Sequence, residues 1–311
     1  MHELYVITGQ TATGKTALAL RTAREHNGEL VNCDSRQVYQ RLDIVTGKDI
    51  TDHSFHKVRD EKHHAIGWYP LREGTIEIPI WMYDVVNPKQ HFSSHDYAAL
   101  AVTVVEDILN RGKTPILVGG TYYYLSHLLY GMGTEGVAPD QTLREELNRH
   151  SLADLQEKLS SLNNDMYTSM NNSDRNNPRR LIRKIELSMH TGVNMTENQY
   201  SFAIADRIGK PLTIHMIGLN HTSRDAMSKK IAERVEKRIT EGAVQEAEAL
   251  MKDGYSLDDP GMKTIGYPQL YAYLKGNSTR EQAINEWILK EMQYAKRQLT
   301  FMRRDPHIEW R

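Results

Sequence analysis

The sequence predicts an α/β protein with a P-loop NTPase-like parallel sheet as its core, a helical insert domain and a helical C-terminal region. Three observations support this fold class. A complete G-x-x-x-x-G-K-[ST] motif joins the first apolar run to a helical pattern. Short apolar runs then alternate with helical patterns, which is typical of a mostly parallel sheet. Strand signals disappear between Pro139 and Ala205, and helical patterns dominate from Thr222 onward.

The motif is a candidate phosphate-binding loop between a predicted strand, residues 4–8, and a predicted helix, residues 16–26. Its glycines let backbone N–H groups turn toward a phosphate, and the helix N-terminus adds partial positive charge. Lys15 can neutralise terminal phosphate oxygens, and the Thr16 hydroxyl can hold Mg²⁺. The motif predicts binding of at least two linked phosphates and leaves open whether they belong to a nucleotide.

Three further strands and a helix are predicted along the chain. We predict strands over residues 29–33, 114–118 and 212–219, and a helix over 95–110 that is capped by Ser93 or Ser94. Ligands of parallel sheets bind beyond the C-terminal ends of the strands. Because Lys15, Asp34 and Thr121 each follow a strand, we expect them to converge on one site.

The expected organisation is a first part of the core at residues 1–138, a helical insert at 139–205, and a return to the core with C-terminal helices at 206–311. Within the insert, residues 152–162 and 178–190 are predicted helices, separated by a polar stretch. Turn signals such as Gly254 punctuate the C-terminal helices.

Composition describes an ordinary soluble protein of 311 residues, with 39% hydrophobic and 25% charged residues. The formal charge of −1 gives no overall signature of nucleic-acid binding, so any such surface requires local clustering of the 39 Lys and Arg residues. One cysteine, Cys33, excludes an intramolecular disulfide and suits a reducing compartment. Without a long apolar run or room for a leader before the first strand, a cytoplasmic location is expected.

Several residues have both a functional and a structural interpretation. Asp34 can serve as general base or can cap a turn, and spacing alone favours the turn. Thr121 can contact phosphate or belong to an ordinary turn, and the tyrosines after it can stack on a base or fill the core. The strand before Gly119 ends in no magnesium-binding aspartate, and its rival Asp84 lies between prolines. Nucleotide hydrolysis is therefore disfavoured and group transfer is favoured.

Basic residues cluster where helical spacing stacks like charges, which favours phosphate-backbone binding. The cluster consists of Arg175, Arg179, Arg180, Arg183 and Lys184. A second cluster surrounds Phe301 and includes Lys296 and Arg297. The helix after Thr222 alternates basic and acidic residues, which is typical of a solvated face. The histidines between residues 53 and 64 lack a paired ligand motif, so a polar surface loop is favoured over a zinc site.

Together these residues resemble the tRNA dimethylallyltransferase family, also called tRNA isopentenyltransferases or IPP transferases. The matching stretches follow the family's order along nearly the whole chain. They are Gly9 to Thr16, Asp34-Ser-Arg-Gln-Val-Tyr39, Val118-Gly-Gly-Thr121, Asn176-Asn-Pro-Arg-Arg180 with Arg183 and Glu186, Ile265-Gly-Tyr267 with Gln269, and Ala295-Lys-Arg-Gln-Leu-Thr300. Each stretch except the phosphate-binding loop is weak alone, whereas the ordered set is highly specific.

The resemblance implies transfer of a dimethylallyl group from dimethylallyl diphosphate to N6 of adenine 37, beside the anticodon of tRNAs reading codons that begin with U. Lys15, Asp34 and Thr121 are the implied catalytic residues, with Asp34 accepting the proton of the adenine amine. Mg²⁺ is the implied cofactor, with Thr16 as its protein ligand. The implied diphosphate-binding residues are Gly9, Gln10, Thr11, Ala12, Thr13, Gly14, Lys15, Thr16 and Arg224.

The resemblance also implies the partners, which are the anticodon stem-loop of tRNA and dimethylallyl diphosphate. No membrane partner is expected, and the protein is expected to be a monomer. The insert would hold the stem. The implied tRNA-binding residues are Asp34, Ser35, Arg36, Gln37, Thr121, Arg144, Arg179, Arg180, Arg183, Lys296 and Arg297.

The chain departs from the family pattern at a few positions. Gln10 stands where the family usually has Pro, Tyr122 replaces a usual Gly, and Pro268 interrupts the Gly-Tyr-x-Gln region. The segment 51–79 is longer than usual and has no assigned function.

Three alternatives stay open. An adenylate dimethylallyltransferase acting on free AMP, ADP or ATP would use the same chemistry without needing the basic insert. A P-loop small-molecule kinase would bind ATP. A non-catalytic RNA-binding relative is disfavoured because Lys15, Thr16, Asp34 and Thr121 are all present.

Overall fold

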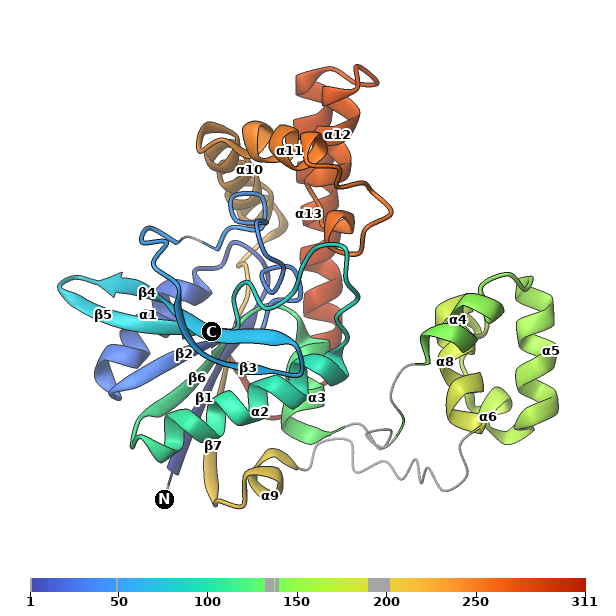
Figure 1. The fold of residues 1–311 in the computed structure, drawn as a ribbon, viewed down its shortest axis with the longest axis horizontal. Coiled ribbons are helices and arrows are strands. Elements are labelled where there is room, and N and C mark those ends of the chain that lie inside the picture. Colours follow the sequence, from blue (N-terminus) through green and yellow to red (C-terminus); the bar gives the residue numbers. More distant parts are fainter. Residues whose placement is uncertain (1, 49, 132–136, 138–139, 190–201) are drawn as a thin grey trace. The chain divides into compact units, whose positions relative to one another are not determined.

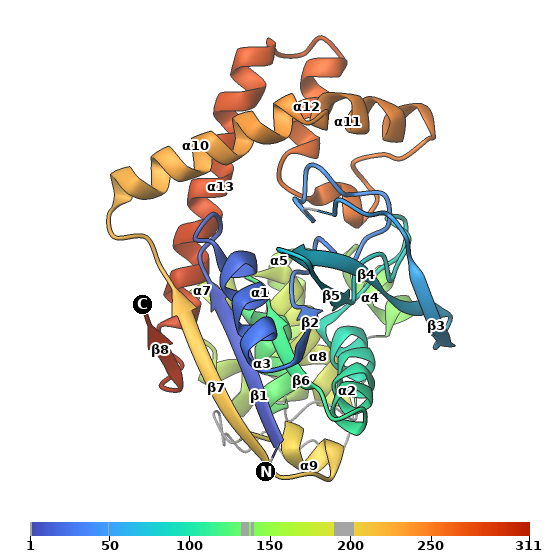
Figure 2. The ribbon, with the colours of Figure 1, turned by 90° about the vertical axis from the view of Figure 1, so that its left-hand side faces the viewer.

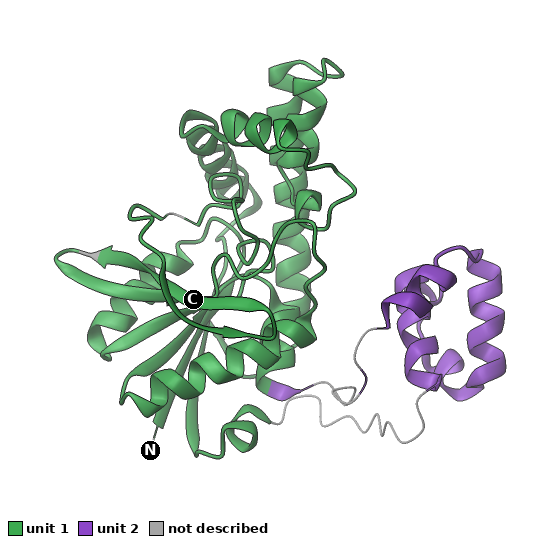
Figure 3. Cartoon of the chain, in the orientation of Figure 1, with its two compact units in different colours: residues 1–129, 203–311 green, residues 130–202 purple. Residues whose placement is uncertain are grey.

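The computed structural model describes residues 2–48, 50–131, 137, 140–189 and 202–311. The chain divides into two compact units (Figure 3). The first unit combines residues 1–129 with 203–311, and the second comprises residues 130–202. Each unit is described by itself below.

A single sheet forms the centre of the first unit, with strand order β3-β4-β5-β2-β6-β1-β7-β8 (Figure 1). Six neighbouring strands run parallel: β5 (Ile76–Trp81), β2 (Gly28–Asn32), β6 (Thr114–Val118), β1 (His2–Gly9), β7 (Leu212–Leu219) and β8 (Ile308–Trp310). The edge is antiparallel and consists of β3 (His56–Glu61) and β4 (His64–Glu73). The predicted α/β class with a mostly parallel core is confirmed.

Two helices cover opposite faces of this sheet. The connection from β1 to β2 passes over β6 in one direction, and that from β5 to β6 passes β2 in the other. Right-handed crossovers therefore place α1 (Lys15–Glu25) and α2 (Ser94–Asn110) on opposite sides (Figure 2). Ala19 and Ala23 of α1 pack against the sheet. Ser93 begins α2 with a capping box, as one of the two predicted caps.

The segment 51–79 contains strands that the sequence does not predict. It supplies β3, β4 and most of β5, so the expected polar loop is wrong. Pro70 and Pro79 lie opposite each other in the β4–β5 pair, and β3 is mostly exposed and charged. These features remove the apolar alternation by which a strand is usually recognised. Among the described residues, no group of three or more His, Cys, Asp or Glu side chains could hold a metal ion.

The C-terminal helices form a layer beyond the sheet (Figure 1). The helix α10 packs on α13, and α11 and α12 pack beside them. Their bounds are α10 Arg224–Thr240, α11 Ala243–Lys252, α12 Tyr267–Leu274 and α13 Arg280–Met302, with a short 3-10 helix at Gly261–Lys263. Pro268 lies in the first turn of α12, where an amide hydrogen has no partner within the helix, so this departure leaves the helix intact.

Two short helices complete the first unit's connections: α3 (Tyr122–Tyr130), which ends at the unit boundary, and α9 (Ile204–Ile208). Tyr124 of α3 is 4% exposed and stacks on Tyr97 of α2, with ring centroids 4.3 Å apart. Of the two interpretations open for this tyrosine, packing in the core is the one that the structure supports.

The described part of the second unit is helical. Its helices are α4 (Gln141–Leu147), α5 (Leu152–Leu162), α6 (Asn164–Ser169), α7 (Asn172–Arg175) and α8 (Pro178–Met189). Leu155 and Leu159 of α5 pack against Leu181 and Ile185 of α8 around a small apolar core. Of the helices that the structure describes in either unit, none has the length and apolar character needed to cross a membrane.

Candidate active site

The phosphate-binding loop follows β1 directly and adopts backbone conformations that its glycines allow. Gly9 has φ 133°, and any Cβ there would collide with the backbone of Leu219 in the neighbouring strand. Gly14 has φ 86° and precedes the first residue of α1, Lys15. Both positions therefore favour glycine, because other residues rarely adopt these backbone angles. The loop ends at a helix N-terminus, where unpaired N–H groups attract anions.

This loop forms one wall of a cleft with a volume of about 440 Å³. The opposite wall comes from α10 and α13. The lining residues include Thr11 to Ala17, Asp34, Gln37, Gly47, Gly120, Lys230, Arg234, Lys237, Arg238, Tyr294 and Gln298. The fold brings Lys15 and Asp34 to this cleft, as we predicted because each follows a strand. Thr121 lies next to the lining residue Gly120.

Long-range hydrogen bonds fix the loop against α13. The Thr11 N–H donates to Gln298 Oε1 at 2.9 Å, and Gln298 Nε2 donates to the Gly120 carbonyl at 2.9 Å. Gln298 thus joins the phosphate-binding loop to the end of β6. The hydroxyl of Thr11 also binds the guanidinium of Arg234.

Gln10, which replaces the family's usual proline, adds two further ties. Its Oε1 accepts the His221 N–H at 3.0 Å, and its Nε2 donates to the Ala295 carbonyl at 3.1 Å. A proline could make neither bond. This departure therefore strengthens the connection between the loop, the end of β7 and α13.

Lys15 lies at the base of the cleft and donates to the Gln10 carbonyl at 2.6 Å. Burial, and next the positive charge of Arg234, lower the pKa of Lys15 to about 7, against the opposing effect of Asp34 and Glu291. A nearby anion favours the charged ammonium. Binding of a diphosphate in the cleft should therefore be coupled to protonation of this lysine.

We expect this coupling to appear as proton uptake. At pH 8 the free lysine is mostly neutral. Binding of dimethylallyl diphosphate, the donor that the resemblance implies, should therefore take up about 0.5–0.9 proton per site when no acceptor is present. The donor contributes little, because a phosphate ester is fully ionised at that pH. Calorimetry in two buffers with different ionisation heats measures the uptake. The uptake should vanish in Lys15→Met at pH 8. At pH 5.5 the lysine is already charged and the donor is partly protonated, so binding should release protons instead. Equal uptake in Lys15→Met at pH 8 would contradict this assignment.

Asp34 lies just after β2 and has the geometry of a turn residue as well as a place in the cleft. Its Oδ1 accepts the Arg36 N–H at 2.8 Å, and its own N–H donates to Asn32 Oδ1 at 2.9 Å. These bonds orient the carboxyl group and leave its second oxygen for another partner. The turn and the functional interpretation are thus compatible.

Thr121 reaches the same region from the end of β6. Its Oγ1 accepts the Ser35 N–H at 3.0 Å and donates to Ser35 Oγ at 3.2 Å. Tyr294 of α13 lies near Thr121, and burial raises the pKa of this tyrosine above its ordinary value. Thr121 therefore connects two sides of the cleft beside Asp34. Its contact with phosphate stays a prediction.

The residues after Asp34 are held by different parts of the chain. Gln37 lines the cleft, and its Nε2 donates to the Gly47 carbonyl at 2.8 Å. Arg36 instead reaches the Pro260 carbonyl at 3.4 Å. Asp84, the rival magnesium aspartate, lies outside the residues that line the cleft and forms an ion pair with Lys48.

Arg224 and Lys296 lie together in a second hollow of about 560 Å³, which Gln10 also lines. The structure thus does not bring Arg224 into the lining of the phosphate-loop cleft, and its predicted diphosphate contact stays a prediction. Arg297 lies over the ring of Tyr294, with 6.0 Å between the guanidinium carbon and the ring centroid.

Sequence reasoning missed the cations that do line the cleft. Lys230, Arg234 and Arg238 share one face of α10 at four-residue spacing, and Glu233 lines the cleft with them. Lys230 and Glu233 are exposed, as expected for a solvated face, whereas Arg238 is buried and departs from that expectation. Intervening glutamates disguise the pattern in the sequence. The signal that reveals it is the i, i+4 repeat of basic residues, read separately from the acidic positions.

In the second unit, two of the predicted tRNA-binding arginines are occupied by a buried carboxylate. Glu186 is 1% exposed and accepts Arg144 Nε at 2.6 Å, Arg144 Nη2 at 2.7 Å and Arg183 Nη1 at 3.1 Å. Burial alone would raise the pKa of Glu186, but the hydrogen bonds from both arginines hold it below its usual value. These contacts give Arg144 and Arg183 a structural role.

Arg179 and Arg180 lie in the first turn of α8 and are exposed, and neither binds Glu186. Arg180 forms an ion pair with Asp174. The side chain of Arg179 is exposed and makes no hydrogen bond or ion pair with another residue within 140–189 or the rest of the described chain. It is available to an anionic partner.

We expect Glu186→Ala to destabilise the second unit by about 3 kcal/mol, because it leaves two partly buried arginines without their carboxylate. Hydrogen exchange of the peptides from residues 140–189 in the whole protein measures this loss. Glu157→Ala, an exposed change on α5, is the matched control.

The pH dependence of this effect has a definite sign. Since folding lowers the pKa of Glu186, its stabilisation is present above the unfolded-state value of about 4.3 and is lost as the pH falls through the lower folded-state value. The difference between wild type and Glu186→Ala should therefore shrink in acid. A constant difference would contradict the ion-pair explanation.

Known proteins resemble this chain along nearly its whole length. The family model described as IPP transferase matches residues 69–305, and one described as isopentenyl transferase matches residues 2–61. A tRNA dimethylallyltransferase of Geobacter sulfurreducens is 34% identical over 99% of this chain and 91% of the relative. The chain belongs to the IPP transferase family. A tRNA dimethylallyltransferase of Halalkalibacterium halodurans is 33% identical, over 99% of this chain and 90% of the relative.

Solved structures of the family extend the likeness to three dimensions. A tRNA isopentenylpyrophosphate transferase from Bacillus halodurans superimposes with a TM-score of 0.65 at 31% identity, covering 100% of this chain and 90% of that protein. A eukaryotic dimethylallyltransferase acting on tRNA gives a TM-score of 0.72 at 22% identity, over 97% of this chain and 70% of that one. The second match concerns the fold alone.

Proposed function

We propose that this protein transfers a dimethylallyl group from dimethylallyl diphosphate to N6 of adenine 37 in tRNAs that read codons beginning with U, and releases diphosphate. The observation that carries the proposal is the cleft itself, in which a phosphate-binding loop and a carboxylate line one cavity. Family membership supports this chemistry for the whole chain, because the relatives align over nearly their full length.

The donor's diphosphate would occupy the phosphate-binding loop. Lys15 and the loop N–H groups would stabilise the negative charge that grows as the bond between the allylic carbon and the diphosphate oxygen breaks. Arg234 is placed to add positive charge, since its guanidinium already contacts Thr11 beside the loop. The loop would therefore hold a leaving group.

The acceptor base would enter beside Asp34. N6 of adenine forms the new bond to the allylic carbon and loses one proton, which the Asp34 carboxylate accepts. The oxygen of Asp34 that Arg36 does not engage is suited to this task. An adenine stacked in an anticodon loop must leave its neighbours to reach such a cleft, as in other base-modifying enzymes.

Magnesium fits the residues at this site. Mg²⁺ commonly keeps several water ligands and is held by substrate phosphates together with few protein groups. The Thr16 hydroxyl, which lines the cleft at the helix N-terminus, would be the protein ligand. Bound there, the ion would neutralise charge on the departing diphosphate.

The tRNA stem would be held through its phosphates. Arg179 and Arg180 are exposed in the second unit, and Lys296 and Arg297 are exposed on α13. These residues carry the proposal for the anticodon stem-loop, while Arg144 and Arg183 would contribute by shaping the unit that presents it.

Arg179→Ala should weaken tRNA binding and lower the slope of log affinity against log salt by about 0.7–0.9, the value for one lost phosphate contact. Arg21→Ala, an exposed change on α1, serves as control. Filter binding at several salt concentrations provides the measurement, and an unchanged slope would remove Arg179 from the RNA-binding surface.

The decisive experiment incubates the protein and Mg²⁺ with labelled dimethylallyl diphosphate and unmodified tRNA, AMP or ADP. We expect label in tRNA. Label only in a mononucleotide would instead identify an adenylate dimethylallyltransferase, and a parallel reaction with labelled ATP tests for a kinase.

A further inference from the structure

A loop without helix or strand connects the Asp34 turn to the edge of the sheet and forms part of the cleft wall. This loop, residues 37–48, contributes Gln37 at its start and Gly47 near its end to the cleft. Loops of this length need specific contacts to hold one conformation. The contacts that hold this one converge on a single buried cation.

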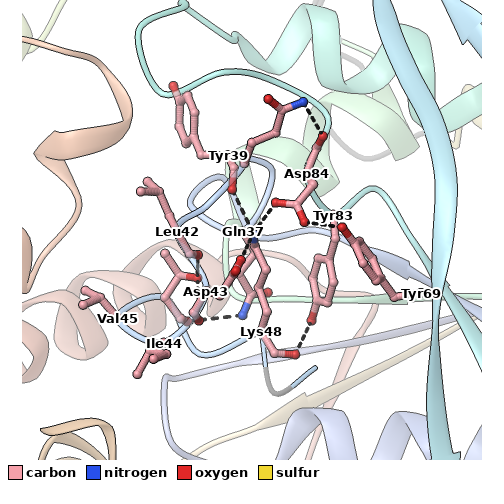
Figure 4. Close-up of polar contacts among 12 residues, drawn as sticks. Gln37, Tyr39, Leu42, Asp43, Ile44, Val45, Lys48, Tyr69, Tyr83 and Asp84 are labelled. Carbon is pink, nitrogen blue, oxygen red and sulfur yellow. Dashed lines mark hydrogen bonds and ion pairs between the residues drawn. The ribbon is translucent and has the colours of Figure 1, made fainter. Parts of the chain in front are cut away.

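Lys48 is that cation. Its side chain is 1% exposed, and its Nζ donates to the Tyr39 carbonyl at 2.8 Å and to Asp43 Oδ1 at 2.6 Å. It also forms an ion pair with Asp84 (Figure 4). The three N–H bonds of the ammonium therefore all have acceptors, two of them in the loop itself.

Asp84 anchors the cation to the sheet edge. Its Oδ2 accepts the Tyr69 hydroxyl at 2.7 Å, and its backbone carbonyl accepts Gln40 Nε2 at 3.1 Å. Tyr83 next to it donates to the Lys48 carbonyl at 3.2 Å. Tyr69 belongs to β4, one of the antiparallel strands that the sequence does not predict. This strand therefore supports the loop 37–48 through Asp84 and Lys48 (Figure 4).

The same loop is tied to Gln37 in the cleft. Gln37 Nε2 donates to the carbonyls of Gly47 and Thr46 at 2.8 and 3.3 Å. Both acceptors immediately precede Lys48 in the chain. A movement of Lys48 would displace these carbonyls and release the amide of Gln37.

Helices of the C-terminal layer hold the outer side of the loop. Glu246 accepts the N–H groups of Asp43, Ile44 and Val45 at 3.0, 2.7 and 3.1 Å. Arg238 donates to the Thr46 carbonyl at 3.0 Å. The phosphate-binding loop is held by Gln298 and by the two ties of Gln10, which do not involve residues 37–48. The helix α10 contacts both loops, since Arg234 binds Thr11.

We propose that Lys48 is a positioning residue, which through Asp43 and Asp84 fixes the loop 37–48 and so holds Gln37 against the acceptor base beside Asp34. The inference rests on the proposed function, since it assigns this wall to the acceptor. Loss of the cation should therefore slow transfer without weakening donor binding.

The test compares Lys48→Met with Lys57→Met, which alters an exposed lysine on β3. Lys48→Met should lower kcat for transfer to tRNA by roughly 10–100-fold, the scale of a small misplacement of reacting groups. The dissociation constant of dimethylallyl diphosphate should stay within about twofold of wild type. Peptides from residues 37–48 should exchange hydrogen faster than in wild type, whereas those covering 9–16 should not change. All measurements are made well below the Tm of each variant.

If Lys48→Met does not fold, two milder variants test the positioning role of Lys48. Asp43→Asn and Tyr69→Phe keep the Lys48–Asp84 pair and should each lower kcat by about 3–10-fold, as expected for one weakened hydrogen bond. Unchanged kcat in both, or a donor affinity that falls together with kcat, would overturn the proposal. If wild type modifies a mononucleotide instead, kcat is compared on that acceptor, and the exchange result is independent of the acceptor.

Discussion

Asp34→Asn should lower kcat for transfer to tRNA by roughly 10²–10⁴-fold, the contribution of a positioned general base. Asparagine retains an oxygen that can accept the Arg36 N–H, which Asp34 accepts at 2.8 Å, so the turn should survive. The amide cannot take the proton of the adenine amine. Donor binding should change little, because the phosphate-binding loop has its own supports in Gln298 and Gln10.

Asp52→Asn is the matched control, because Asp52 Oδ1 also accepts the N–H two residues on, that of Ser54, at 3.0 Å. That change should leave kcat as in wild type. Single-turnover transfer of labelled donor measures the rate, and equilibrium binding of dimethylallyl diphosphate measures affinity. If Asp34→Asn lost donor affinity and rate together, a structural or magnesium-binding role would replace the role of base.

Lys15→Met should lower kcat by about 10²–10³-fold, the usual loss when one donor to a developing negative charge is removed. Unlike Asp34→Asn, it should also weaken donor binding, because the ammonium attracts the diphosphate before and during departure. The lysine Nζ already lies within the loop, 2.6 Å from the Gln10 carbonyl, so only a short movement brings it to a phosphate oxygen.

Lys113→Met provides the comparison, since this half-buried lysine is not among the residues that line the cleft and donates to Asn27 Oδ1 at 3.1 Å. The dependence of rate on donor concentration separates the change in kcat from that in KM. Unchanged kcat in Lys15→Met would assign the charge stabilisation to Arg234 or Mg²⁺. A variant with intact donor affinity would contradict the placement of the diphosphate in this loop.

The sequence predicts the parallel strands well for a physical reason. Residues 114–118 and 212–219 are short apolar runs bounded by turns, and the structure has strands with these same bounds. The edge strands are different because Pro70 faces Pro79 and the outer strand is charged. Their pairing depends on partners far along the chain, which local patterns do not show.

The site, like the sheet, has parts that local sequence patterns predict and parts that they do not. The phosphate-binding loop is contiguous, so its motif can be recognised locally, but Gln298 and Arg234 join it from far along the chain. The basic patch in the insert illustrates the converse. Glu186 is visible three residues after Arg183, yet only burial reveals that it also binds Arg144 and occupies both side chains.

The bond between Thr11 and Gln298 also joins two segments that are synthesised far apart in time. The phosphate-binding loop leaves the ribosome well before its partner in α13, because 287 positions separate Thr11 from Gln298. At typical rates of 5–20 residues per second, the interval is roughly 15–60 s. Over this interval a nascent chain carries the loop without its partner in α13. The cleft acquires its wall from α13 only when that helix docks.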